Sequence, residues 1–519
     1  MARVERTVIL ENSYRKPKAK PLNITTSSVL IIVGSGPVGV QFAQELIQRG
    51  FKGIIKLFGD EPWRPYNRVQ LSALLAGEIR YGDIVYPEIS TDKEHYHFFN
   101  RRVTEIHALK HSLIDSNGVR HQYDALVLAT GSTPWIPKLD KVDLKGVFVF
   151  RDLDDAQQLM ARSVRTRHTV VIGGGLLGVE AARAMQRNHT QVTLLHQSNR
   201  LMNRQLDVEA GAILKRSLEG YGIEVKLNAG VSALLGEDVV TGVELRNGQV
   251  LTCDTVIFAT GIQPNVAMAR SSGIKVGRGI RINNHLQTNL PDIFAIGECA
   301  EHDDQIYGLL APGHEQAAVL ADRLCGGNAH YKGSKATTSL KVLDLPVFTL
   351  GWIGDEYEHR IDETLIFHCE SGAYRKLFLQ RNRLRGVVAI GECEEKNRLH
   401  QVVTSQQRIL PWQKKRFKKD GRLWPVGKVR HVRDWPASAK LCSCRNVSVG
   451  KLLYAQRAGC STADSLAACT GAGTVCGTCA PLLQELCSFP HQQPAWQVAL
   501  KPLLAVMAVA MAVLSIALV

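Results

Sequence analysis

Two stretches of the chain repeat one order of apolar and polar positions: an apolar run, a glycine-rich turn, an amphipathic segment and a second apolar run. Residues 28–61 read SVLIIVGSGPVGVQFAQELIQRGFKGIIKLFGDE, and residues 168–197 read HTVVIGGGLLGVEAARAMQRNHTQVTLLHQ. Each stretch predicts a strand, a turn, a helix and a strand. Two further apolar runs, ending in VLATGS (127–132) and IFATGI (257–262), would close these units. The duplication predicts an α/β protein with two Rossmann-like dinucleotide-binding domains.

The remaining sequence divides by composition. Residues 336–400 contain alternating segments such as YRKLFLQ and LRGVVAIG and predict a small α+β domain. A segment rich in basic and aromatic residues, 401–440, reads as a linker, and seven of the twelve cysteines follow in the helical module 441–488. We expect the first nucleotide-binding domain to comprise 28–150 and 271–335, and the second 151–270. A chain of 519 residues is too long for one core and agrees with several domains.

The first glycine turn has the spacing of a dinucleotide-binding loop. Gly34 would allow the tight turn, Gly36 would let the backbone approach a pyrophosphate, and Gly39 would let the helix pack on the strand. Asp60, followed by Glu61, stands about where a ribose-binding carboxylate belongs. The backbone N–H groups at the start of the helix would face the phosphates.

The second turn repeats the spacing with Gly173, Gly175 and Gly178, followed by Glu180. Its second strand ends at His196 rather than at a carboxylate, with Arg200 close behind. A carboxylate there would favour NAD, and an arginine would accommodate the 2′-phosphate of NADP, so the sequence leaves NADH and NADPH open. Two such sites require two dinucleotides, and FAD with NAD(P)H is the expected pair.

Several motifs resemble one family. GSGPVG, LATGS, GGGLLGVE, ATGIQPN and IFAIGECA resemble the two-dinucleotide-binding pyridine-nucleotide oxidoreductases. FGDEPWRPYNRVQLS, LMNRQLD and IYGLLAPGHEQA are similar to the large subunit of assimilatory NAD(P)H nitrite reductase and to the electron-transfer subunit of assimilatory nitrate reductase. The resemblance covers about residues 28–488. It implies FAD contacts from Gly34, Gly36, Gly39, Asp60, Arg68, Thr130, Gly131, Gly297 and Glu298. It implies NAD(P)H contacts from Gly173, Gly175, Leu177, Gly178, Glu180, His196 and Gly261.

Two departures narrow the chemistry. Many relatives in the wider ferredoxin-reductase group carry a lysine where Ala73 stands, so a lysine beside the flavin is not expected here. Disulfide reductases of the superfamily place a cysteine pair beside the flavin, and neither of the corresponding regions holds one. Electrons are therefore expected to leave the flavin by another route.

The cysteine-rich module offers such a route. Cys442 and Cys444 form a C-x-C pair, and after 31 intervening residues Cys476 and Cys479 form a C-x-x-C pair. A thioredoxin-like dithiol would need a strand before its helix, and zinc prefers two C-x-x-C-like knuckles. The spacing resembles the bacterioferritin-associated-ferredoxin type of [2Fe–2S] domain, which implies these four thiolates as ligands. Cys460, Cys469 and Cys487 fall outside this pattern and are expected to be packing residues.

The same module contains segments that predict short helices. VSVGKLLYAQRAG and STADSLAACTG offer Ser448 and Ser461 or Thr462 as N-caps, with Gly459 and Gly471 as stops. APLLQELC after Cys479 predicts a third helix, whose N-terminal N–H groups would offset the negative charge of cluster sulfurs.

Charge and the last residues of the sequence bear on partners. The net charge is +15, and residues 414–433 hold nine Lys or Arg and one acid. No nucleic-acid fold accompanies this basic stretch, so nucleic acid is not expected to bind; a solvated linker, anionic lipid and an acidic redox partner stay open. Residues 502–519 carry no charge, and we expect a C-terminal transmembrane helix over 498–519. Positive charge before this span places the redox domains on the cytoplasmic side of the membrane.

Together these features predict an NAD(P)H-oxidising electron-transfer flavoprotein. Hydride would pass from NAD(P)H to FAD, and single electrons would pass to the [2Fe–2S] cluster and an external acceptor, which the resemblance links to nitrate or nitrite assimilation. The sequence holds no second four-cysteine set for a sirohaem–[4Fe–4S] centre, so we do not expect it to reduce nitrite by itself. The alternatives are an NAD(P)H:disulfide reductase using Cys476 and Cys479, and a membrane-tethered redox or iron sensor.

Overall fold

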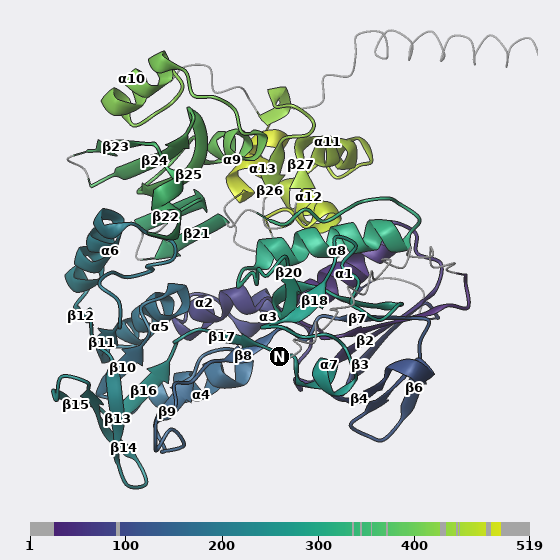
Figure 1. The fold of residues 1–519 in the computed structure, drawn as a ribbon, viewed down its shortest axis with the longest axis horizontal. Helices are drawn as coiled ribbons and strands as arrows, with labels where there is room; N and C mark the ends of the chain where they lie inside the picture. The colour runs from purple at the N-terminus through teal and green to yellow at the C-terminus, as the bar shows by residue number, and fades with distance from the viewer. Residues whose placement is uncertain are drawn as a thin grey trace, which may run out of the picture.

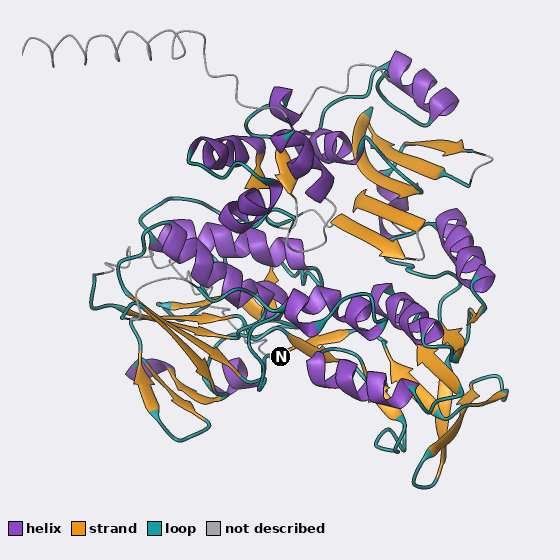
Figure 2. Cartoon of the chain, turned by 180° about the vertical axis from the view of Figure 1, so that it is seen from behind, coloured by secondary structure: helices purple, strands orange, loops and turns teal. Residues whose placement is uncertain are grey.

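The computed structural model describes most of the chain (Figure 1). The described residues are 25–89, 94–334, 337–342, 345–353, 355–369, 372–425, 432–442, 445, 447–473 and 479–488. The third domain lies over the second nucleotide-binding unit, and the cysteine-rich module lies over the first, as Figures 1 and 2 show from opposite sides.

The first nucleotide-binding unit is built on a five-stranded parallel sheet in the order β19-β7-β1-β2-β3. Its strands are β1 (Val29–Val33), β2 (Ile54–Gly59), β3 (Tyr96–Asn100), β7 (Ala125–Leu128) and β19 (Ile293–Ala295). Helix α1 (Pro37–Gln48) packs on β1 and β2 and lies alongside α8 (Leu310–Leu324). Because β19 and α8 follow the second unit in sequence, the first unit is made of two separate segments of the chain.

The second unit repeats this architecture with the sheet order β12-β11-β10-β16-β9. Its parallel strands are β9 (Val147–Val149), β10 (His168–Ile172), β11 (Gln191–Leu195), β12 (Ile223–Lys226) and β16 (Thr255–Phe258). Its helices are α4 (Leu153–Ser163), α5 (Leu176–Arg187) and α6 (Val208–Gly220). Strand β9 pairs with β16. The predicted boundary of the first unit at residue 150 was therefore wrong, because β9 belongs to the sheet of the second unit. The sequence does not show with which sheet an edge strand pairs.

The duplication extends beyond the parallel sheets. A three-stranded antiparallel sheet is inserted before β7 in the first unit and before β16 in the second. It consists of β4 (Val103–His107), β5 (Ser112–Asp115) and β6 (Arg120–Gln122) in the first, and of β13 (Val231–Gly236), β14 (Val240–Leu245) and β15 (Val250–Thr252) in the second. Between the units, β8 (Ser132–Pro134) pairs antiparallel with β17 (Ile262–Pro264). The remaining short elements are α2 (Leu71–Leu75), α3 (Tyr81–Ile84), α7 (Ala267–Ser271), β18 (Ile280–Ile282) and β20 (Ala300–His302).

The third domain is an antiparallel sheet in the order β21-β22-β25-β24-β23. Its strands are β21 (Thr337–Val342), β22 (Leu345–Gly351), β23 (Glu363–His368), β24 (Tyr374–Gln380) and β25 (Arg383–Ile390), and its helices are α9 (Lys396–Ser405) and α10 (Pro411–Asp420). YRKLFLQ and LRGVVAIG are strands, as expected. Residues 401–425 are not a linker, because α9 and α10 pack on this sheet and bury Val402, Val403 and Phe417 in its core.

The cysteine-rich module folds around its own small apolar core. It comprises β26 (Lys440–Cys442), β27 (Val447–Ser448), α11 (Val449–Arg457), α12 (Ala463–Thr470) and α13 (Ala480–Cys487). Ser448 and Thr462 cap α11 and α12 by accepting hydrogen bonds from Lys451 N and Ser465 N. The three predicted helices are thus present, and Gly471 ends α12 at φ +75°.

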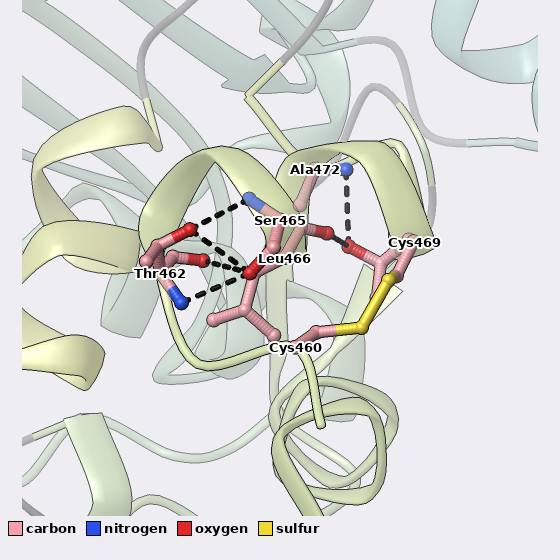
Figure 3. Close-up of a disulfide and its surroundings, with 7 residues drawn as sticks. Cys460, Thr462, Ser465, Leu466, Cys469 and Ala472 are labelled. Carbon is pink, nitrogen blue, oxygen red and sulfur yellow. Dashed lines mark hydrogen bonds between the residues drawn. A yellow bond between two sulfur atoms is a disulfide. The ribbon is translucent and has the colours of Figure 1, made fainter. Parts of the chain in front are cut away.

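Cys460 and Cys487 pack against this core, as expected, but Cys460 does more than pack. Its sulfur forms a disulfide with that of Cys469, which joins the loop after α11 to the last turn of α12, with Cα atoms 6.9 Å apart (Figure 3). The C-x-C and C-x-x-C pattern carries no information about which of the cysteines outside it form a disulfide. Within the described ranges, no helix is long and apolar enough to cross a bilayer, and the predicted span 498–519 lies outside those ranges.

Candidate functional site

The first glycine loop forms a cradle that is open at one position. A Cβ atom on Gly34, where φ is +119°, would lie 2.2 Å from the carbonyl oxygen of Ala129, and one on Gly39 would lie 1.9 Å from that of Gly34. A Cβ on Gly36 would meet only Arg68 Nη2, at 3.8 Å. Contacts that short admit no side chain at the outer two glycines. The room above Gly36 is what close approach of a pyrophosphate requires.

The second loop has the same geometry. A Cβ on Gly173, at φ +121°, would lie 2.3 Å from the carbonyl oxygen of Ala259, and one on Gly178 would lie 1.7 Å from that of Gly173. Nothing lies within 4 Å of a Cβ on Gly175, and the same holds for Gly261, at φ +123°, in the ATGI motif. Leu177 lies half-buried in the first turn of α5. The chain therefore contains two cradles suited to two dinucleotides.

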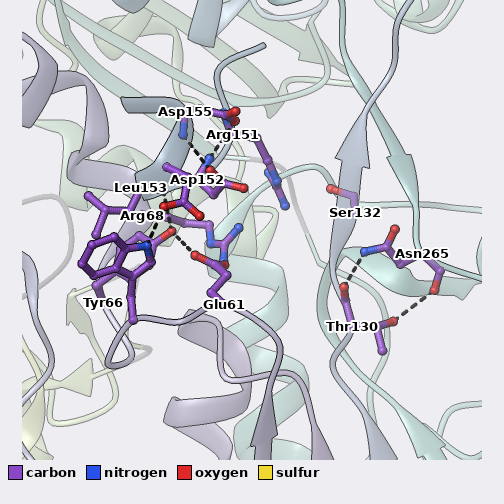
Figure 4. Close-up of polar contacts among 12 residues, drawn as sticks. Glu61, Tyr66, Arg68, Thr130, Ser132, Arg151, Asp152, Leu153, Asp155 and Asn265 are labelled. Atoms are coloured by element: carbon purple, nitrogen blue, oxygen red, sulfur yellow. Dashed lines mark hydrogen bonds and ion pairs between the residues drawn. The ribbon is translucent and has the colours of Figure 1, made fainter. Parts of the chain in front are cut away.

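The acid at the end of β2 that faces the first cradle is Glu61. Asp60 is exposed to solvent, whereas Glu61 Oε1 accepts a hydrogen bond from Arg68 Nη2 at 2.6 Å (Figure 4). Glu61 Oε2 also accepts one from the hydroxyl of Tyr66 at 2.5 Å. Burial raises the pKa of this tyrosine, which keeps its hydroxyl a donor. Both acids stand where a ribose-binding carboxylate is expected, and Asp60 was the predicted site residue. The contacts favour Glu61, which holds Arg68 beside Gly36.

A second polar group gathers around Glu298. Its Oε2 accepts hydrogen bonds from Ser132 Oγ at 2.7 Å and from Arg151 Nη2 at 2.6 Å. Gly297, at φ +82°, precedes it and packs against Val38. Sequence reasoning missed Ser132 and Arg151. The sequence offered only a weak signal for them. Ser132 is the last residue of the LATGS motif, and Arg151 directly follows the apolar run 147–150.

Thr130 and Gly131 belong to the crossing between the units. Thr130 Oγ1 donates to the carbonyl oxygen of Asn265 at 3.0 Å, and Asn265 Nδ2 donates back to the carbonyl oxygen of Thr130 at 2.8 Å (Figure 4). Gly131 has φ +63°. This reciprocal pair ties the LATGS turn of the first unit to the ATGIQPN turn of the second.

Glu180 on α5 accepts a hydrogen bond from an uncharged side chain of the first unit. Its Oε2 accepts a hydrogen bond from Ser72 Oγ on α2 at 2.6 Å. Burial raises the pKa of this carboxyl to about 7, and the Ser72 hydrogen bond opposes the rise. The neighbouring residue on α2 is Ala73, so the position where relatives carry a lysine supplies no charge.

His196 and Arg200 follow β11, and the side chains of both are buried. His196 Nδ1 accepts a hydrogen bond from the Gly174 N–H at 3.0 Å, and burial lowers the pKa of its ring. Arg200 Nε donates to the carbonyl oxygen of Leu206 at 3.1 Å, and Arg200 Nη2 donates to that of Asn203 at 3.3 Å. Both side chains are buried and engaged with the backbone, so neither is presented to a 2′-phosphate.

The structure describes two of the four predicted cluster ligands. Cys442 and Cys479 are 3% and 6% exposed and belong to the same apolar core, while Cys444 and Cys476 lie outside the described residues. Helix α13 starts directly after Cys479, as a helix N-terminus facing cluster sulfurs would require. Across the described ranges, no three or more His, Cys, Asp or Glu side chains converge on one metal site.

Three cysteines of the two nucleotide-binding units are buried or half-buried thiols. Cys253, Cys299 and Cys325 are thiols outside any disulfide, and burial raises the pKa of each, that of Cys253 to about 12. Such thiols are poor nucleophiles.

Comparison with known proteins agrees with this geometry. The family model described as pyridine nucleotide-disulphide oxidoreductase matches residues 28–319. The chain belongs to this family. The model described as rubredoxin NAD+ reductase C-terminal domain matches residues 337–407, so the third domain includes α9. Family membership and the two glycine cradles make the chain an FAD-dependent NAD(P)H oxidoreductase.

Individual relatives narrow the resemblance. The oxidoreductase is 36% identical to the nitrite reductase [NAD(P)H] of Bacillus subtilis (strain 168), over 88% of this chain and 57% of that protein. It is 32% identical to the assimilatory nitrate reductase electron transfer subunit of the same organism, over 88% and 59%. The chain thus spans under three fifths of either relative's length. The ferredoxin reductase for the CYP199A2 system of Rhodopseudomonas palustris superposes with a TM-score of 0.70 at 26% identity, covering 75% of this chain and 97% of that one. The predicted resemblance to the nitrite and nitrate reductase group is confirmed.

Proposed function

We propose that the oxidoreductase takes electrons from NAD(P)H and passes them singly, through a [2Fe–2S] centre on the 441–488 module, to an external acceptor. The observation that carries this proposal is the pair of matching glycine cradles, each open only at its middle glycine. When bound, FAD would accept a hydride from NAD(P)H and release electrons one at a time.

The residues of the chain divide the work of binding and orientation. Gly34, Gly36 and Gly39 would hold the FAD pyrophosphate, and Arg68, fixed by Glu61, supplies positive charge beside Gly36. Gly173, Gly175 and Gly178 would hold the nicotinamide nucleotide. The Thr130–Asn265 pair keeps the two turns in register between the sites. Cys442, Cys444, Cys476 and Cys479 would bind the cluster.

The acceptor belongs, we propose, to nitrate or nitrite assimilation. The two Bacillus subtilis relatives carry that activity in their names, and the chain matches only part of each. A separate reductase or a small redox protein would then receive the electrons.

We also propose that the protein associates with the cytoplasmic face of a membrane. The uncharged run 502–519 supports this, although it lies outside the described residues. Helix α10 adds support from the described part: Leu410 and Trp412 are about half exposed, next to exposed Lys415, Lys418 and Lys419. Aromatic and basic side chains together suit an anionic lipid surface. Flotation of the full chain with phosphatidylserine vesicles, but not after deletion of 502–519, would support this arrangement; equal recovery of both forms would contradict it.

The central proposal is tested on purified full-length protein by its visible spectrum, its flavin and iron content, and its NADH oxidation with ferricyanide or cytochrome c. We expect one FAD per chain, two irons per chain and turnover with both acceptors. Replacing Cys442 and Cys479 by serine should remove iron and cytochrome c reduction while ferricyanide reduction persists. Protein without iron that gains two titratable thiols after NAD(P)H addition would instead identify a disulfide reductase. Protein that binds both cofactors yet shows no steady turnover would identify a sensor.

A further inference from the structure

Basic side chains of the cysteine-rich module meet acids on the first nucleotide-binding unit. Lys440 Nζ lies 3.0 Å from Glu315 Oε1 on α8, and Lys451 Nζ lies 4.0 Å from Glu45 Oε1 on α1. The other oxygen of Glu315 accepts a hydrogen bond from Ser334 Oγ at 2.6 Å, which fixes the carboxylate. Figures 1 and 2 show the module lying over α1 and α8.

Arg445 reaches across the same interface. It is 6% exposed, and its guanidinium carbon lies 5.9 Å from the ring centroid of Tyr86, within the range of a cation–π contact. Its Nε lies 3.2 Å from the place of a Cβ on Gly471, at the end of α12. In sequence, Arg445 directly follows Cys444, and Gly471 stands five residues before Cys476. One buried side chain of the module therefore lies against both the end of α12 and the first unit.

Tyr86 in turn belongs to the backbone that positions Arg68. The N–H of Tyr86 donates to the carbonyl oxygen of Pro65 at 2.9 Å, and the N–H of Asn67 donates to that of Ile84 at 2.8 Å. The segment that Arg445 contacts is thus hydrogen-bonded to the segment leading to Arg68, whose guanidinium lies beside Gly36. A continuous line of contacts runs from the first glycine cradle to Arg445.

The character of the interface is polar. The apolar core of the module and that of the first unit are separate clusters. Both ion pairs place the cation on the module and the anion on the unit, and the Lys440–Glu315 pair is about a third exposed on each side. Partly exposed ion pairs are individually weak and are screened by salt. Such an interface fixes an orientation yet can open.

We propose that Arg445, with Lys440 and Lys451, forms a clamp that docks the cysteine-rich module on the first unit in one orientation, with Arg445 against Tyr86. Arg445 is a positioning residue in this arrangement. Only the clamp's consequence rests on the function proposed above: the docked module would hold its metal centre on the FAD side of the molecule, where single electrons leave.

The clamp is tested by hydrogen–deuterium exchange on the full chain, read in peptides from α8 and from residues 440–473. We expect Lys440→Glu to raise exchange in both regions by about twofold to fivefold, the effect of losing one partly exposed ion pair. Glu315→Lys combined with Lys440→Glu should restore protection, because the charges are then exchanged rather than lost. Arg445→Gln and Tyr86→Leu should raise exchange at least as much. Lys415→Glu makes the same change in net charge on the exposed face of α10 and should leave both regions unchanged.

Unchanged exchange in Lys440→Glu and Arg445→Gln, or no rescue in the double variant, would overturn the clamp. In holoprotein, Lys440→Glu and Arg445→Gln should show flavin reduction by NADH at the parental rate and slower electron delivery to cytochrome c. Parental protein without iron would contradict the proposed cluster, while the exchange result would still decide whether the clamp exists.

Discussion

Ser72 on α2 donates its hydroxyl hydrogen to Glu180 on α5, with 2.6 Å between Oγ and Oε2. The two helices come from different nucleotide-binding units and pack against each other. A hydroxyl stabilises a carboxylate less than a cation does, so burial dominates and the pKa of Glu180 rises to about 7. The junction of the two units therefore contains a carboxyl that changes charge near neutral pH.

Replacing Glu180 by glutamine should flatten the pH dependence of stability. Between its ordinary pKa and about 7, Glu180 is ionised in the unfolded chain and protonated in the folded one. Stability from this group is complete at low pH and is lost as pH rises through that window. We expect the parental protein to lose about 2 kcal/mol relative to Glu180→Gln between pH 5 and 8, seen in thermal unfolding midpoints. Ser72→Ala should extend the fall to higher pH, since the Ser72 hydrogen bond lowers the pKa of Glu180 in the folded state only. Parallel curves for all three proteins would contradict the assignment.

The middle glycines of the two cradles should separate binding from folding. Gly36→Val and Gly175→Val place side chains where a Cβ has at least 3.8 Å of room, so both variants should fold. We expect Gly36→Val to purify with little flavin, and Gly175→Val to retain flavin with a raised KM for NADH. Flavin absorbance per chain and steady-state kinetics measure these effects. Gly39→Ala is the comparison: its Cβ would lie 1.9 Å from a carbonyl oxygen, and it should lose soluble protein.

NADH should be preferred over NADPH. After β11, Arg200 is buried and hydrogen-bonded to backbone carbonyls, and at the end of the neighbouring β12, Lys226 Nζ lies 2.7 Å from Glu224 Oε1. A 2′-phosphate would gain no charge-assisted hydrogen bond from them, and such a bond to a charged group contributes about 1.5–3 kcal/mol. We expect kcat/KM to favour NADH by roughly tenfold or more, since about 1.4 kcal/mol is a factor of ten. Gln197→Arg, at an exposed position next to His196, should narrow the ratio; a parental enzyme faster with NADPH would refute the assignment of Arg200.

The Cys460–Cys469 disulfide should stabilise the cysteine-rich module. It closes a loop with a sequence separation of 9, for which chain entropy gives about 3 kcal/mol or less. We expect the Cys460→Ser/Cys469→Ser variant to lower the unfolding midpoint of the module without lowering flavin content. Alkylation followed by mass spectrometry should label neither sulfur in oxidised protein and both after dithiothreitol. Labelling of either cysteine before reduction would show that the bond does not form.

Local chemistry explains what the sequence predicted well. The glycine loops, the helix caps at Ser448 and Thr462 and strands β24 and β25 depend on residues close together in sequence. The placement of Asp60 and Glu61 does not depend on neighbouring residues alone. Both follow β2, and only the packing of the Tyr66–Arg68 segment decides which acid turns inward. The sequence placed His196 at the nucleotide site, but only the tertiary structure shows that its ring accepts a hydrogen bond from the Gly174 N–H of the second loop.

The sequence by itself determined that the chain contains two dinucleotide cradles and a cysteine-rich module, since turn geometry and ligand spacing are written in neighbouring residues. Tertiary structure alone decided that β9 belongs to the second sheet, that Cys460 meets Cys469, that Ser72 meets Glu180, and that Arg445 reaches Tyr86. Each of the last two pairs joins residues more than a hundred positions apart, and no local pattern records which distant surfaces burial brings together.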